Sequence, residues 1–143
     1  MNAASLSLLQ KQLILHEGVR LKPYRCTAGK LTIGIGRNLD DVGISQEEAL
    51  GLLRNDIARA LSAVRIELPW FDRLDDIRQR VVVDMAFNLG IDGLLAFKQT
   101  LAAVASGDYD RAATEMLNSR WAAQVGERAR RLARMMRTGR DEF

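Results

Sequence analysis

Cysteine and histidine are almost absent from the sequence, which has one residue of each, Cys26 and His16. A zinc site built from the usual cysteine and histidine ligands therefore has too few ligands, and a disulfide within the chain is impossible. We expect no metal and no cofactor on these grounds.

Long hydrophobic runs are also missing. The most apolar stretch near the start, residues 6–15, is interrupted by Lys11 and by two glutamines. A membrane-spanning helix needs about 20 mostly apolar residues, and a signal peptide needs a basic segment, an unbroken apolar run and a cleavage site. We therefore expect no stable membrane insertion and a chain that starts in the cytoplasm.

The charge is modestly basic, with a net charge of +3 and a pI near 9.4. Such a charge favours an anionic partner. Five arginines crowd the C-terminal segment: Arg128, Arg130, Arg131, Arg134 and Arg137. They form either a solvated helix face or a site for nucleic acid or an acidic polymer. Since no helix-turn-helix, zinc-finger or RNA-binding motif accompanies them, we do not expect nucleic acid as a partner.

The remaining composition is that of a globular domain: 143 residues with 48% hydrophobic and 27% charged residues are enough for one substantial core. Helical spacing predicts a first helix over residues 5–16, with Ser5 as N-cap and Gly18 after its end. Residues 19–36 then predict a β-hairpin around the Thr27–Lys30 turn, and residues 42–44 a brief third strand.

From Ser45 onward the sequence predicts helices. Ser45 and Glu48 have the spacing of a capping box, and apolar residues continue at helical spacing to about Arg65. Beyond Asp72, further helices are expected near residues 75–89, 94–105, 108–117 and 126–137. The segment around Val81 and Val82 is apolar enough to predict a buried central helix.

These elements predict an α+β fold that is mostly helical. We expect a single domain with a small hairpin lobe over residues 17–45, a bridging helix over 45–65, and a helical lobe over 66–143. The apolar stripe of the helix at 5–16 assigns it to the helical lobe as well, because the small lobe offers little to cover it. A cleft between lobes is a preferred place for a ligand.

Three residues of the hairpin region have side chains suited to chemistry. Glu17 stands at a helix end, where it is either a solvated charge or a cleft carboxyl with a pKa raised by partial burial. Cys26 is either a buried, inert thiol or a reactive one. Thr32 is either an ordinary strand residue or one whose hydroxyl holds a water. Gly34 and Gly36 leave one strand face without side chains, as a bulge or a close ligand approach requires.

Several motifs together resemble the phage-type lysozymes, glycoside hydrolase family 24. They are residues 17–24, 27–29 and 32–36 in the hairpin region, 44–49 at the start of the bridging helix, 86–90 and 95–97 in the central helix and the turn after it, and 119–121 and 137–139 near the end. The resemblance covers residues 9–140. The connection at residues 38–43 is much shorter than in the T-even phage enzyme that typifies the family. The resemblance implies a lysozyme-like fold with the cleft between its lobes.

The resemblance also implies an activity: an endolysin muramidase that hydrolyses the β-1,4 bond between N-acetylmuramic acid and N-acetylglucosamine in peptidoglycan with inversion. The family's trio falls on Glu17, Cys26 and Thr32. Glu17 is then the general acid, and Thr32 orients the attacking water. Cys26 stands where the family has Asp or Cys. Its role stays open between a thiolate base, a residue that shapes the water site, and a nucleophile that forms a glycosyl thioether.

Further positions follow from the same resemblance. Arg128 is expected to pair with Glu17, and Arg37 with Asp56. The expected substrate contacts are Gly36, Phe87, Asn88 and Thr100. The partner is the glycan strand of peptidoglycan, and we expect a monomer that stays in the host cytoplasm until a holin-like pore releases it. An inactive peptidoglycan-binding domain is the alternative function.

Overall fold

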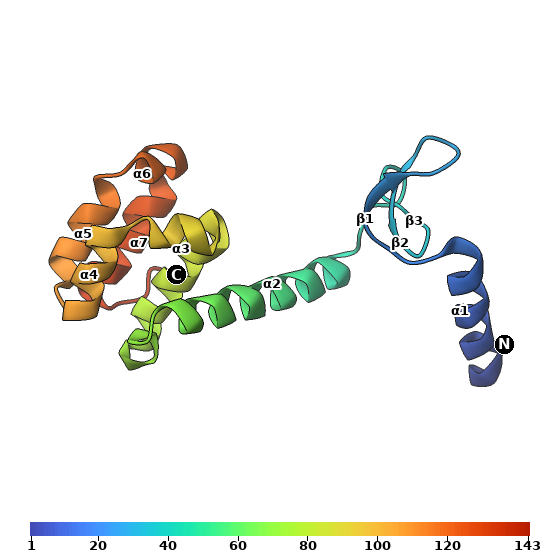
Figure 1. The fold of residues 1–143 in the computed structure, drawn as a ribbon, viewed down its shortest axis with the longest axis horizontal. Coiled ribbons are helices and arrows are strands. Elements are labelled where there is room, and N and C mark those ends of the chain that lie inside the picture. Colours follow the sequence, from blue (N-terminus) through green and yellow to red (C-terminus); the bar gives the residue numbers. More distant parts are fainter. The chain divides into compact units, whose positions relative to one another are not determined.

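The computed structural model describes all residues from Met1 to Phe143. The chain forms two compact units, Met1–Gly51 and Leu52–Phe143, and each is described here by itself (Figure 1). None of the helices combines the length and the apolar character that crossing a membrane requires.

The first unit begins with helix α1, Ala3–Glu17. Its N-cap is Asn2, whose side-chain Oδ1 accepts a hydrogen bond from the Ser5 backbone N–H at 2.9 Å. The prediction of Ser5 as N-cap is therefore wrong, because Asn2 caps as well as serine does and lets the helix begin earlier. The predicted end is confirmed: Gly18 has φ 74° and donates its N–H to the Ile14 carbonyl.

A three-stranded antiparallel sheet follows α1, with strands in the order β1 (Arg20–Arg25), β2 (Leu31–Gly34) and β3 (Arg37–Asn38). The hairpin of β1 and β2 confirms the prediction. The third strand lies at residues 37–38 instead of 42–44, because Asn38 and Asp41 close a turn there: the Asp41 N–H donates to Asn38 Oδ1 at 2.9 Å.

Helix α2, Gln46–Glu67, starts in the first unit and ends in the second. Its capping box is confirmed by two reciprocal hydrogen bonds. The Glu48 N–H donates to Ser45 Oγ at 3.1 Å, and the Ser45 N–H donates to Glu48 Oε1 at 2.9 Å. Both backbone donors are thereby satisfied at a helix end that would otherwise leave them free.

The second unit is a group of helices around one apolar core (Figure 1). After the short 3₁₀ turn η1 (Phe71–Arg73) come α3 (Asp76–Leu95), α4 (Lys98–Ser106), α5 (Tyr109–Leu117), α6 (Arg120–Val125) and α7 (Glu127–Thr138). Helix α3 buries Val81, Val82 and Met85, which confirms the predicted burial of this segment. Gly90, with φ 76° and ψ 163°, is non-helical and divides α3, so the predicted end of this helix near residue 89 is confirmed, and the next helix, expected over 94–105, is α4 at Lys98–Ser106.

The structure thus has the α+β, lysozyme-like fold that the sequence predicts. The large fully buried side chains, among them Phe71, Leu94, Met116 and Met136, all belong to the second unit. The assignment of residues 5–16 to the helical lobe stays a prediction.

Candidate active site

Glu17 is the last residue of α1, and its carboxylate rests against the backbone of Gly36. A Cβ atom added to Gly36 would lie 2.9 Å from Glu17 Oε2, so the flexible end of the Glu17 side chain would have to move to make room for it. Gly36 also has φ 71°, a conformation that favours glycine. The Glu17 side chain is exposed and lies against Gly36, and the contact of Gly36 with substrate stays a prediction.

Cys26 lies directly after β1, at the start of the turn that joins β1 to β2. Its backbone closes this turn, since its N–H donates to the Lys30 carbonyl at 2.9 Å and its carbonyl accepts from the Gly29 N–H at 2.8 Å. The thiol is half-buried. Backbone hydrogen bonds at Lys30 and then Ala28 lower the pKa of the Cys26 thiol, and the Thr32 hydroxyl adds to this effect. The turn therefore favours the thiolate.

Thr32 is buried, and it pairs with Tyr24 of β1 on one side and with Asn38 of β3 on the other. Its Oγ1 donates a hydrogen bond to the Lys30 carbonyl at 2.8 Å. When its single proton is engaged in this way, the lone pairs of the hydroxyl remain able to accept a hydrogen bond. A water that donates to Thr32 Oγ1 would have its own lone pairs turned away from the threonine.

The three residues of the predicted trio thus belong to one unit. Cys26 and Thr32 lie on the two sides of the turn that joins β1 to β2, and Gly36, in the turn between β2 and β3, lies against the Glu17 side chain. A carboxyl, a thiol whose pKa is lowered and a hydroxyl with a free lone pair are groups from which acid–base hydrolysis can be built.

Arg37 is held by a different carboxylate from the one expected. Its Nη1 donates to Glu48 Oε1 at 2.8 Å, and its Nη2 lies 2.7 Å from Glu48 Oε2. The Arg37 guanidinium lowers the pKa of Glu48 to about 2. Asp56 forms its ion pair with Arg59. The expected Arg37–Asp56 pair would join the two units and stays a prediction, and the sequence analysis missed Glu48 as a partner.

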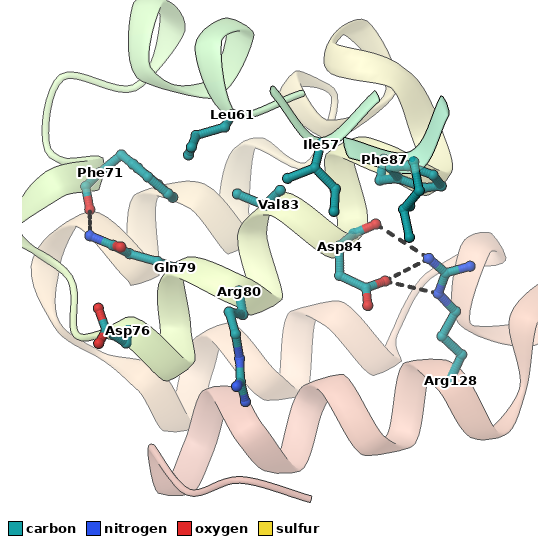
Figure 2. A pocket seen from close by; sticks show the side chains of 11 residues that line it. Ile57, Leu61, Phe71, Asp76, Gln79, Arg80, Val83, Asp84, Phe87 and Arg128 are labelled. Carbon is teal, nitrogen blue, oxygen red and sulfur yellow. Dashed lines mark hydrogen bonds and ion pairs between the residues drawn. The ribbon is translucent and has the colours of Figure 1, made fainter. Parts of the chain in front are cut away.

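In the second unit, Phe87 and Arg128 line a cavity of about 730 Å³ whose walls include Ile57, Leu61 and Val83 (Figure 2). Arg128 forms an ion pair with Asp84, with 2.6 Å between Nη2 and Oδ1 and 2.9 Å between Nε and Oδ1. Sequence reasoning missed Asp84 as a partner. The expected pair of Arg128 with Glu17 would also join the two units and stays a prediction.

Asn88 and Thr100, the other expected substrate contacts, lie around Trp121. Asn88 Oδ1 accepts a hydrogen bond from Trp121 Nε1 at 2.7 Å, so this acceptor already has a partner within the protein. Thr100 is buried and lines a pocket of about 360 Å³ with Glu115 and Arg120. Their contact with sugar stays a prediction.

The arginines of α7 are largely neutralised by nearby carboxylates. Arg130 and Arg134 pair with Glu127, and Arg137 lies 3.7 Å from Asp110. Nowhere in the chain do three or more histidine, cysteine or acidic side chains gather as a group that could hold a metal ion.

Comparison with known proteins decides the family. The pattern of the family described as phage lysozyme matches residues 15–138, which include Glu17, Cys26 and Thr32. The chain belongs to the phage lysozyme family. This membership supports a peptidoglycan-hydrolysing glycosidase and agrees with the fold described above.

Two relatives are similar over most of their length, and a third over about a quarter of its length. The chain is 34% identical to an endolysin of Acyrthosiphon pisum secondary endosymbiont phage 1, over 83% of this chain and 84% of the relative. It is 26% identical to a probable T4-type lysozyme of Dictyostelium discoideum, and this match covers 93% of this chain and 95% of the relative. It is also 29% identical to the pre-baseplate central spike protein Gp5 of Enterobacteria phage T4, where the match spans 86% of this chain and 26% of the spike protein.

Proposed function

We propose that this lysozyme-family chain cleaves the β-1,4 bond between N-acetylmuramic acid and N-acetylglucosamine in peptidoglycan. The single observation that carries the proposal is the family match over residues 15–138, within which the first unit holds Glu17 against Gly36 and carries Cys26 and Thr32 on the two sides of one hairpin turn. By similarity to an endolysin, the proposal includes lysis of the bacterial wall at phage release. Holin-dependent release, a host-cytoplasmic location and a monomeric state stay predictions.

The proposed reaction is a single displacement. Glu17 donates its proton to the glycosidic oxygen as the bond to the muramic acid carbon breaks, and a water attacks that carbon from the opposite face. Thr32 Oγ1 accepts one hydrogen bond from this water, and the Cys26 thiolate takes up the proton that the water loses. The product then has the inverted configuration. The lowered pKa of Cys26 supports the role of base.

The change Glu17→Gln tests the proposal, because it removes the titratable proton while keeping the shape of the side chain. Purified wild-type protein is expected to clear a peptidoglycan suspension, and Glu17→Gln to lose nearly all of this activity. Glu47→Gln, a change at an exposed carboxylate on α2, is the control and should keep full activity. Full activity in Glu17→Gln would disprove the mechanism.

The reaction products test the finer parts of the proposal. Digested wall should release new reducing ends on muramic acid, and early samples should hold the α anomer, as inversion of a β-linkage requires. Reducing ends on glucosamine would contradict the proposed bond, and an early β anomer would contradict inversion. Peptidoglycan binding without hydrolysis would favour the alternative, an inactive binding domain.

A further inference from the structure

Three consecutive residues, Gly36, Arg37 and Asn38, link the surroundings of Glu17 to those of Thr32. Gly36 lies against the Glu17 side chain, and Asn38 is the register partner of Thr32 in the sheet. Arg37 lies between them and pairs with Ile33 of β2. Any shift of this segment, residues 36–38, would therefore move both the surface under the proposed acid and the strand beside the proposed water-binding hydroxyl.

Strand β3 within this segment has only two residues, and the Leu39 N–H continues its pairing with β2 by donating to the Leu31 carbonyl at 2.7 Å. The Arg37 side chain supplies a second anchor. It reaches the first turn of α2, where its two terminal nitrogens face the two oxygens of Glu48 at 2.8 Å and 2.7 Å, and its Nη1 also donates to the Gly43 carbonyl at 3.1 Å. A two-pronged contact of this kind fixes orientation as well as distance.

Glu48 is itself fixed by local structure. Its Oε1 accepts from the Ser45 N–H at 2.9 Å, and its own N–H donates to Ser45 Oγ at 3.1 Å. The positive end of the α2 dipole favours a carboxylate in this first turn. Arg37 is therefore bound to a rigid, ionised group instead of a mobile surface side chain. Both side chains remain 36% and 43% exposed, so the contact contributes geometry more than stability.

We propose that Arg37 and Glu48 are positioning residues for catalysis: their ion pair fixes residues 36–38 to α2, and through this segment it sets the places of Glu17 and Thr32. This inference rests on the proposed function. Neither side chain is proposed to touch the substrate. Because the pair acts through Glu17 and Thr32, its loss should affect the rate of the chemical step more than the binding of the glycan.

The change Glu48→Gln tests the pair, because glutamine at this position keeps the capping box but removes the charge that Arg37 needs. We expect kcat for peptidoglycan hydrolysis to fall about tenfold, since sub-ångström misplacement of catalytic groups is costly, while KM stays within about twofold. Arg37→Gln should show the same loss. Arg37→Lys keeps the charge but loses the two-pronged contact, and should recover part of kcat.

Two controls separate positioning from general damage. Glu47→Gln removes a carboxylate from the same helical turn and should leave both kcat and KM unchanged. The double variant Arg37→Gln/Glu48→Gln should be no slower than the slower single variant, because both changes remove the same contact. Thermal melting should show that every variant is folded at the assay temperature.

Hydrogen exchange provides a measurement that does not depend on activity. The Leu39 N–H donates to the Leu31 carbonyl at 2.7 Å, next to β3. Its exchange should be faster in Glu48→Gln than in wild type or in Glu47→Gln. An active wild type whose kcat is unchanged in Glu48→Gln would overturn the positioning role alone. An inactive wild type would contradict the proposed function, and unchanged Leu39 exchange would then overturn the anchor as well.

Discussion

Cys26 shows how a short turn can alter the chemistry of one side chain. A thiol at its usual pKa is mostly neutral at pH 7, which makes it a poor base. Here the turn that closes between Cys26 and Lys30 lowers the pKa of the thiol through its backbone hydrogen bonds. The same turn places the Thr32 hydroxyl beside it. The lowered pKa makes the proposed role of base chemically reasonable for a thiol.

Substitutions at Cys26 separate its open roles. Cys26→Ala and Cys26→Ser should lower kcat about a hundredfold or more, because both remove the base. Cys26→Asp should keep substantial activity, because a carboxylate is also a base. Activity should fall at low pH as the base becomes protonated, and this fall should move to lower pH in Cys26→Asp, since an aspartate has the lower pKa. If Cys26→Ala keeps the full rate, Cys26 is neither base nor nucleophile.

The first turn of α2 has two functions in one element. Ser45 and Glu48 cap the helix, and Glu48 also binds Arg37. The hydrogen bond from Arg37 is the main cause of the lowered pKa of Glu48, with the Ser45 backbone second. A carboxyl with a lowered pKa stabilises the folded state only while it is ionised.

The stability of the first unit should therefore depend on pH in a way that Glu48→Gln removes. The pKa of Glu48 falls from 4.5 to about 2 on folding, so its contribution is complete above pH 4.5 and disappears as the pH falls through 2. The difference in denaturation midpoint between wild type and Glu48→Gln should be constant near neutral pH and shrink across this acidic range. A difference that persists unchanged at pH 2 would contradict the assignment.

Sequence reasoning succeeded where the signal is local. The end of α1 at Gly18 and the Ser45–Glu48 capping box depend on residues within one turn, and both are confirmed. It failed where two near-equal local choices compete, as between Asn2 and Ser5 for the N-cap. It also misplaced β3, because the Asn38–Asp41 turn moves this strand to an earlier position. Ion pairs between residues far apart in the sequence were not predicted: Arg37 pairs with Glu48, and Arg128 pairs with Asp84.

The candidate site was predicted mainly through resemblance. Spacing alone left Glu17, Cys26 and Thr32 with ordinary structural explanations, and only the combined motifs linked them to one activity. The family match supports that link. Gly36 was singled out because a glycine-bearing strand face suggests close approach, and its close neighbour is the Glu17 carboxylate.

At the scale of the whole molecule, burial is concentrated in the second unit, and Trp121 shows how distant segments are joined there. Trp121 is 4% exposed and meets the Phe97 ring edge-on at 5.8 Å. Its indole N–H donates to Asn88 on α3, 33 residues earlier in the sequence. A buried donor of this kind needs its partner, since an unsatisfied one costs about 1–3 kcal/mol.

Asn88→Ala should therefore lower the free energy of unfolding by about 1–3 kcal/mol, because the Trp121 N–H loses its acceptor. Asn55→Ala, at an exposed position of α2, should have little effect. Adding Trp121→Phe to Asn88→Ala removes the unpaired donor and should make the two losses less than additive. Denaturant unfolding followed by circular dichroism measures all four proteins, and equal stability of the two alanine variants would contradict the prediction.

The half-buried Cys26 is the only thiol in the chain. On the proposed function, a reagent that counts thiols therefore also counts active sites, without any engineered tag. The thiol content of a preparation then gives the concentration of competent enzyme, against which a turnover number can be calculated. It also follows that storage under oxidising conditions should inactivate the protein in proportion to the thiol lost, and that a reductant should restore activity only for the reversible, early stages of sulfur oxidation.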